Sequence, residues 1–348
     1  TQMFESRAIM YALYTTLLVA MISALVATVI GTVTAIAISH MKPVSKNIFM
    51  SISNIPMLNA DIVTGIALML WFSRFTNLGY VSILLAHITF NIPYVILSVL
   101  PKLKQTNRYT YEAALDLGAS PVKAFFKVVF PDIVPGVLSG FMLAFTMSLD
   151  DFVITHFTKG PGIDTLSTKI YTEVRKGIKP EIYALSTIMF VTVLVLLLLI
   201  NYSPKEEEET VVRKKKVRKP SRVKKILIQR VVPVAICIVF IGGGFYYAKE
   251  NDVMNGEKLV VYNWGEYIDP EVLTMFEEET GIDIVYEEFE TNEILYPKIS
   301  SGAIAYDVIC PSDYMIQRMI ENDLLSEINF DNIPNLKNIG KQYLERSR

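Results

Sequence analysis

Three aspartates lie in or beside long apolar segments, where a carboxylate is costly to bury. Asp61 interrupts one such segment, and Asp150 and Asp151 directly follow another. Ionisable groups at membrane depth usually face the interior of a helix bundle or a water-filled path. We therefore expect Asp61, Asp150 and Asp151 to line a translocation path. Two alternatives stay open: Asp150 and Asp151 could cap the outer end of a helix, and Asn54 or Asn59 could satisfy Asp61.

The segments that must position these acids are long and apolar. A membrane-spanning helix needs roughly 20 apolar residues, and 51% of the 348 residues are hydrophobic. Six segments qualify or nearly qualify as spans: Tyr11–Ile38, Ile48–Phe72, Leu78–Leu100, Ile133–Leu149, Ile182–Tyr202 and Val231–Tyr247. The composition therefore predicts an α-helical membrane protein that crosses the plasma membrane several times.

Lysine and arginine in the connecting segments predict the orientation, because basic loops favour the cytoplasmic side. His40–Asn47, Pro101–Asp132 and Ser203–Arg230 are basic and share one side if all six segments span. The basic segment His156–Glu181 contradicts this rule, but three segments agree. We therefore expect residues 203–230 to form a charged cytoplasmic linker, and residues 250–348 to be extracellular.

A polar loop between two of the spans has a pattern typical of two short helices. Glu112–Leu117 consists of helix formers, and Gly118 is a natural residue to end a helix. Ser120 and Pro121 favour the start of a second helix, which we expect to cover Val122–Phe130 and to end before Pro131. The loop could serve as a docking element for another protein, or it could be an ordinary interfacial helix.

After residue 257 the pattern changes to alternating strands and helices. Strands are expected at 258–264, 282–286 and 306–310, and helices at 270–280, 295–301 and 314–321. This alternation predicts part of a parallel α/β domain with helices on both faces. Cys310 is expected at a buried strand end.

Other chemistry is not supported by the residues. Cys237 and Cys310 give no disulfide framework, and the three histidines His40, His87 and His156 have no metal-ligand spacing. The chain has no phosphate-binding loop of the G-x-x-x-x-G-K-[ST] type, and no catalytic constellation appears. We therefore expect no catalytic site, no metal and no cofactor in this chain.

Residues 5–202 resemble the PotC-type permease subunit of spermidine/putrescine ABC importers, without its first helix. The resemblance rests on five motifs: Pro56–Ile62, His87–Phe90, Glu112–Gly118, Ser148–Asp151 and Lys169–Tyr171. It implies a type I ABC-importer permease fold in which Glu112, Ala113, Ala114 and Gly118 couple the chain to an ATPase dimer. The ATPase would be a separate subunit that uses ATP and Mg²⁺, and a second permease subunit would complete the channel.

Residues 257–343 resemble the beginning of PotD-type polyamine-binding proteins. The matching motifs are Tyr262–Tyr267, Glu279–Ile282, Tyr286–Glu293, Tyr306–Val308 and Pro311–Tyr314. The resemblance implies substrate contacts by Trp264, Glu266, Tyr267, Ser312 and Tyr314. Aromatic faces and a carboxylate suit an organic cation, although Trp264 and Tyr267 could instead be core aromatics. The match covers only part of one lobe, so tight polyamine binding is not expected.

The sequence therefore favours a polyamine importer subunit with a fused extracellular binding domain. We expect about five permease helices in residues 1–202, a linker at 203–230, a tether helix at 231–249 and a truncated α/β lobe at 250–348. We also expect both ends of the sequence to be those of a fragment. Two alternatives remain: an ABC importer for another small solute, and a tethered extracellular sensor that signals through its basic segment.

Overall fold

The computed structural model describes residues 7–175, six helical residues between 183 and 194, and residues 258–340 except 266 and 303. They divide into two compact units: one is mainly helical, and the other is formed mostly by residues after 256. The expected linker at 203–230 and the tether at 231–249 lie outside the described residues, as does most of the expected span Ile182–Tyr202.

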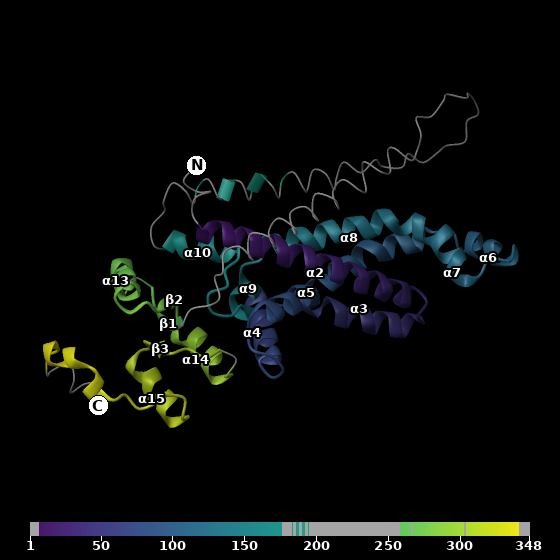
Figure 1. Cartoon of the computed structure of the whole chain (residues 1–348). Helices are drawn as coiled ribbons and strands as arrows, with labels where there is room; N and C mark the ends of the chain where they lie inside the picture. The colour runs from purple at the N-terminus through teal and green to yellow at the C-terminus, as the bar shows by residue number, and fades with distance from the viewer. Residues whose placement is uncertain are drawn as a thin grey trace. The chain divides into compact units, whose positions relative to one another are not determined.

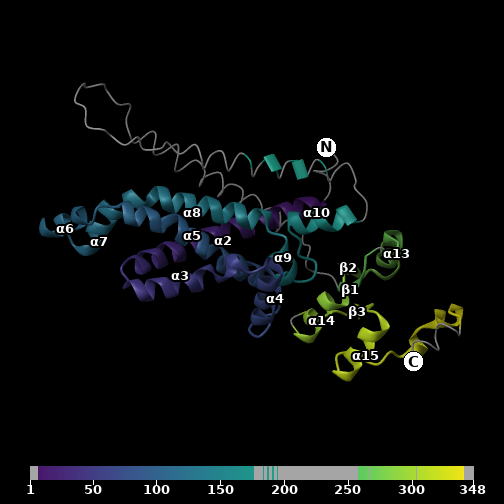
Figure 2. The same cartoon turned by 180° about the vertical axis from the view of Figure 1, so that it is seen from behind.

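Three long helices, α2 (Arg7–Ser39), α5 (Tyr80–Gln105) and α8 (Phe130–Asp150), pack side by side in the helical unit (Figures 1 and 2). Within the described residues, three helices are long and apolar enough to cross a membrane: Ile9–Ser39, Tyr80–Gln105 and Pro121–Asp150. The mainly helical fold and the membrane character predicted from the composition are thus confirmed.

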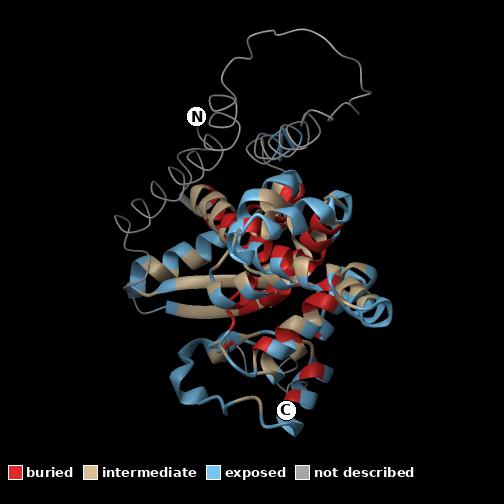
Figure 3. Cartoon of the chain, turned by 90° about the vertical axis from the view of Figure 1, so that its right-hand side faces the viewer, coloured by how far each residue is buried: buried red, intermediate tan, exposed pale blue. Residues whose placement is uncertain are grey.

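The core between these helices is built from small and branched residues, coloured red in Figure 3. A Cβ atom at Gly31 of α2 would lie 2.7 Å from Cβ of Val95, and one at Gly140 of α8 would lie 3.2 Å from its Cα. Small residues at such contacts let membrane helices approach closely. The close packing of α2 and of α8 against α5 therefore depends in each case on a glycine opposite Val95.

The expected span Ile48–Phe72 is not one straight helix. It consists of α3 (Pro43–Leu58) and α4 (Asp61–Phe72), which meet at an angle of 105° and form a broken span or a re-entrant loop. Asn59 has an extended backbone, and Asp61 lies in the first turn of α4. The break has a physical reason, because a carboxylate is favourable near a helix N-terminus and asparagine favours helix ends.

The two short helices of the polar loop are α6 (Arg108–Asp116) and α7 (Pro121–Ala124). Gly118 ends α6 with φ of 84°, and the side chain of Ser120 caps α7 by accepting a hydrogen bond from the Lys123 N–H. Both predicted signals are thus confirmed. In the helical unit these helices lie at the opposite end of α8 from α10 (Leu166–Arg175) (Figure 1).

The prediction that the second helix ends before Pro131 is wrong. After α7 the chain forms a π-helical segment, η1 (Phe125–Val129), which continues directly into α8. The N–H of Phe130 donates to the carbonyl of Phe125. The wider π turn makes room for the proline ring, which would clash with the backbone of a regular α-helix. The span thus begins at Pro121 and is longer than the expected Ile133–Leu149.

The second unit contains a three-stranded parallel sheet in the order β2-β1-β3, as the alternating pattern predicted. Its strands are β1 (Lys258–Trp264), β2 (Asp283–Phe289) and β3 (Val308–Ile309), and its helices are α13 (Pro270–Thr280), α14 (Asn292–Ser300) and α15 (Asp313–Glu321). Two 3₁₀ turns follow, η2 (Phe330–Asn332) and η3 (Pro334–Asn338). The core residues are Tyr262, Phe289, Leu295, Met315 and Met319. Cys310 is exposed, contrary to expectation, because β3 ends one residue before it.

Candidate functional site

The three aspartates singled out in the sequence line one cavity of about 290 Å³ in the helical unit. Asp61 comes from the start of α4, Asp150 ends α8, and Asp151 precedes α9 (Val153–Thr158). Aromatic residues share the wall with them: Phe90, Tyr94 and Phe152. Among the described residues that line this cavity there is no lysine or arginine. The cavity can therefore offer carboxylates and aromatic faces to a cation.

Asp150 and Asp151 have different surroundings although they are adjacent. The carboxylate of Asp151 accepts hydrogen bonds from the N–H of Ile154 at 3.3 Å and of Thr155 at 2.8 Å, and from the Thr155 hydroxyl at 2.8 Å. Its side chain is only 10% exposed. Asp150 is exposed. Asp151 thus caps the first turn of α9 and not the outer end of α8, which the capping alternative had proposed for this pair, whereas Asp150 lies open to the cavity.

A buried histidine completes the support of Asp151. His87 of α5 is fully buried, and its Nε2 lies 3.5 Å from Oδ2 of Asp151 and 2.9 Å from Oγ1 of Thr155. Its Nδ1 lies 3.0 Å from Oγ of Ser148 on α8. Buried polar groups are stable only when they are paired, so this contact joins α5, α8 and α9.

The network extends around Ser148 to a second side chain of α5 and to one side chain of α2. The side-chain amide of Asn91 donates to Ser148 Oγ at 2.6 Å, and Ser23 Oγ of α2 lies 3.0 Å from the same atom. Sequence reasoning missed this network. One signal was available, because His87 and Asn91 are four residues apart and therefore share one face of an otherwise apolar helix.

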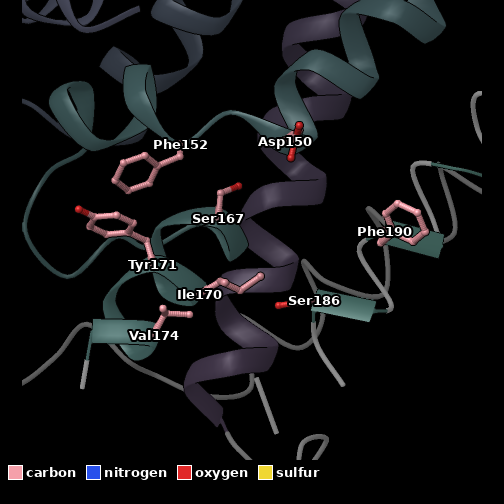
Figure 4. Close-up of a pocket in the computed structure, with 8 residues that line it drawn as sticks. All are labelled: Asp150, Phe152, Ser167, Ile170, Tyr171, Val174, Ser186 and Phe190. Carbon is pink, nitrogen blue, oxygen red and sulfur yellow. The ribbon is translucent and has the colours of Figure 1, made fainter. Parts of the chain in front are cut away.

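A second cavity, of about 560 Å³, lies beside the first and is shown in Figure 4. It is lined by Asp150 and Phe152 together with residues of α10, among them Ser167, Ile170 and Tyr171. The rings of Phe152 and Tyr171 face each other with centroids 4.3 Å apart (Figure 4). Asp150 and Phe152 therefore belong to the walls of both cavities.

The residues expected to couple to an ATPase lie on α6 and at its end. Glu112, Ala113 and Gly118 are exposed, and Ala114 is half-buried. Exposed apolar side chains occur in the same stretch of the chain, namely Tyr109, Leu117, Val122 and Phe126. We call these eight residues the loop patch. Small residues beside exposed apolar side chains permit close approach by another protein.

In the second unit the predicted substrate residues gather at the carboxyl edge of the sheet, where parallel α/β folds bind ligands. Trp264 ends β1 and is half-buried against Phe289, with ring centroids 4.6 Å apart. Tyr267 is 71% exposed and is thus not a core residue, and its ring centroid lies 6.3 Å from that of Trp264. Glu266 lies outside the described residues.

Two residues that sequence reasoning missed hold this edge together. The Asn292 amide donates to Ser312 Oγ at 3.0 Å and to the Tyr314 hydroxyl at 2.8 Å, while its oxygen accepts from the Ser312 N–H. The Tyr314 hydroxyl also donates to Glu293. The pKa of the Glu293 carboxyl is lowered by hydrogen bonds from the backbone N–H of Glu293 itself and from the side chains of Thr291 and Tyr314. Glu293 therefore stays anionic at neutral pH.

Comparisons with known proteins point to membrane transport. Residues 27–203 match the family described as "Binding-protein-dependent transport system inner membrane component". The putrescine transport system permease protein PotI of Escherichia coli K12 is 36% identical over 200 residues, which are 55% of this chain and 71% of that protein. The spermidine/putrescine transport system permease protein PotC of the same strain is 39% identical over 181 residues, or 52% and 69%.

The C-terminal part has matches of its own. Residues 250–345 match a family described as "Hypothetical lipoprotein (MG045 family)". The substrate-binding protein PotD of a Streptococcus pneumoniae spermidine/putrescine ABC transporter is 50% identical over 26% of this chain and 28% of that one, with a TM-score of 0.25. The match thus spans less than a third of that protein. The permease resemblance noted for residues 5–202 agrees with the relatives found for that part of the chain.

Proposed function

Because this chain belongs to the binding-protein-dependent transport system inner membrane components, which are non-catalytic permease subunits, we propose that it carries polyamines through the membrane. The observation that supports this substrate is the convergence of Asp61, Asp150 and Asp151 with aromatic rings in one cavity. The relatives named above transport putrescine or spermidine.

The cavity has the chemistry that an organic di- or trication requires. A carboxylate offers each ammonium group a charge-assisted hydrogen bond, and an aromatic face attracts the cation. Methylene groups between the ammonium groups pack on Phe90, Tyr94 and Phe152. An anion would need lysine or arginine here, and the lining residues of the two cavities that the structure describes include neither.

Energy for transport comes from a separate ATPase dimer in this proposal. The loop patch docks on that partner at the cytoplasmic surface, and ATP and Mg²⁺ are bound there and not by this chain. A second permease subunit completes the path. The exposed apolar side chains Tyr109 and Leu117 support docking, because both precede the candidate span that begins at Pro121 and a solvated loop gains nothing from exposing them.

The second unit serves as an extracellular solute-binding lobe fused to the permease. Trp264, Glu266, Tyr267, Ser312 and Tyr314 contact the polyamine, and the anionic Glu293 adds a countercharge. The placement of four of these residues at the carboxyl edge of a parallel sheet supports this role. The linker at 203–230 and the tether at 231–249 connect the two parts.

The proposal is tested by the uptake of labelled putrescine and spermidine into proteoliposomes that contain this chain, its partner permease and its ATPase. Hydrogen bonds to charged groups contribute about 1.5–3 kcal/mol, so Asp61→Asn is expected to lower ATP-dependent uptake by about tenfold or more. Asp132→Asn is the matched control, because Asp132 lies in the first turn of α8 and lines neither cavity. An assembled complex that hydrolyses ATP but takes up neither polyamine would exclude this substrate class.

A further inference from the structure

One aromatic side chain stands where the two cavities meet. Asp150 and Phe152 are the residues that line both of them, and Asp151 between them lines only the smaller one. For a solute that uses both cavities, these two side chains border the passage. A carboxylate there attracts a cation and does not exclude it, so the ring of Phe152 is the group that can close the passage.

Contacts with neighbouring aromatic rings hold the side chain of Phe152 in its orientation. Its centroid lies 4.3 Å from that of Tyr171 and 5.4 Å from that of His156. The ring is half-buried and lies next to open volume on two sides. A rotation about its side-chain torsions costs the stacking contacts but disturbs no hydrogen bond.

The backbone beside this ring is fixed much more firmly. Asp151 accepts hydrogen bonds from Ile154 and Thr155, and His87 Nε2 lies near both Asp151 and Thr155. The elbow between α8 and α9 is therefore anchored at Asp151, the residue directly before Phe152. Side-chain rotation of Phe152 is the motion that this geometry leaves available.

We propose that Phe152 is a partition between the two cavities, and that its rotation away from Tyr171 admits an elongated organic cation while Asp150 supplies the countercharge. This inference rests on the proposed transport function and assigns Phe152 the role of a specificity-determining residue. A flexible chain of methylene groups can slide past an aromatic face that bulkier solutes would not clear.

The partition can be tested by thiol labelling, which needs no knowledge of the cargo. The full chain is assembled with its partners after Cys237→Ser and Cys310→Ser. Met147→Cys then places a thiol in the smaller cavity and Ile170→Cys places one in the larger cavity, since each residue lines only that cavity. The probe is 2-aminoethyl methanethiosulfonate, a small cation, applied to each side of the proteoliposome in turn.

From the side at which Ile170→Cys reacts, we expect Met147→Cys to react slowly while Phe152 is present. Phe152→Ala should raise that rate about fivefold, the effect of losing one aromatic stacking contact on a two-state equilibrium. Phe152→Tyr, which keeps the ring, should leave the labelling rate of Met147→Cys unchanged. The labelling rate of Ile170→Cys should be the same with phenylalanine, alanine or tyrosine at position 152. Equal rates at Met147→Cys with phenylalanine and alanine would overturn the proposal.

If Phe152→Ala does not assemble, Tyr171→Leu provides a second route. It removes the stacking partner and leaves Phe152 in place, so it should accelerate labelling of Met147→Cys in the same direction. Uptake assays separate this inference from the proposed function. If the complex shows the expected labelling pattern but carries no polyamine, the partition proposal stands and the proposed substrate is contradicted. If the complex carries polyamines but its labelling does not depend on residues 152 and 171, the partition proposal is contradicted and the proposed transport function stands.

Discussion

Nε2 of His87 lies 3.5 Å from Oδ2 of Asp151, so an imidazole in the middle of α5 supports the carboxylate at the elbow between α8 and α9. The same nitrogen lies 2.9 Å from the hydroxyl of Thr155, which itself donates to Asp151. His87 and Thr155 therefore fix the carboxylate of Asp151, whereas the adjacent Asp150 stays open to the cavity.

The first prediction concerns the stability of this elbow. His87→Ala removes one hydrogen-bond partner from each of the buried hydroxyls of Ser148 and Thr155, and each lost hydrogen bond costs about 0.5–1.5 kcal/mol. Thermal unfolding of the purified complex, followed by fluorescence, should occur at lower temperature. His40→Ala is the matched control, because His40 is exposed at the end of α2. Equal melting temperatures for the two variants would contradict the supporting role of His87.

The second prediction separates the two adjacent aspartates. Asp151→Asn weakens the cap of α9 and should lower the melting temperature, since losing a capping group costs about 1 kcal/mol. Asp150→Asn removes an exposed carboxylate and should lower polyamine uptake while the melting temperature stays the same. The pair is compared by measuring both quantities on each variant. A reversed pattern would show that Asp151, and not Asp150, meets the solute.

The third prediction concerns the loop patch. Glu112→Lys reverses a charge on the exposed surface of α6 and should reduce copurification of the ATPase subunit and its stimulation by substrate. Asp116→Lys makes the same charge change on the same helix outside the patch, and it should have the smaller effect. The measurement is the amount of ATPase retained on the tagged chain after washing. Equal retention by wild type and Glu112→Lys would argue against docking at this surface.

The fourth prediction concerns the acid dependence of the loop before α10. Burial opposes ionisation of Asp164, but Nζ of Lys159 lies 2.7 Å from its carboxylate, and the net effect lowers the pKa of Asp164 below its usual value. A lowered folded-state pKa contributes stability that is present above the unfolded-state value of about 3.8 and lost as pH falls through the folded-state value.

The melting temperature of the wild type should therefore fall as the pH is lowered below about 4. Asp164→Asn should show a shallower fall over the same range, because the titrating partner of Lys159 is gone. Asp132→Asn serves as the control, since no ion pair involving Asp132 is found among the described residues. Parallel curves for wild type and Asp164→Asn would show that this ion pair adds nothing to acid stability.

The fifth prediction concerns the sheet edge of the second unit. Asn292→Ala removes the amide that contacts both Ser312 and Tyr314, so spermidine binding by the full chain should weaken about as much as in a Ser312→Ala, Tyr314→Phe double variant. Each lost hydrogen bond contributes about 1 kcal/mol. Isothermal titration calorimetry on the full chain measures the affinity, and Asn329→Ala, in the turn before η2, is the control. Unchanged affinity in Asn292→Ala would place the ligand elsewhere.

Much of the local structure could be predicted because it depends on neighbouring residues. The bounds of β1 and α13 agree with the expected 258–264 and 270–280, since strand alternation ends at a turn and Asp269-Pro270 begins a helix. Gly118 was recognised for the same reason, because only a few residues adopt positive φ easily. Pro131 does not end the helix, because a proline near a helix start is tolerated where a π turn precedes it.

The break before Asp61 also escaped prediction, because apolar composition does not distinguish one straight span from two helices that meet at 105°. Hydropathy reports how much of a segment avoids water, but not the direction in which it runs. The residues that mark the break are Asn59 and Asp61; the sequence predicts a path-lining acid and its possible partner there, and not the ends of two helices.

The sequence by itself determined which groups are expensive to bury, and thus that Asp61, Asp150 and Asp151 required an explanation. It also determined the chemistry those groups can perform, since a carboxylate beside aromatic rings favours a cation wherever the chain places it. Tertiary structure alone decided which of them meet. The rotation of α5 about its axis brings His87 to Asp151, and the elbow after α8 turns Phe152 between two cavities. These relationships depend on helices packed across long stretches of chain, whose relative rotation no local pattern encodes.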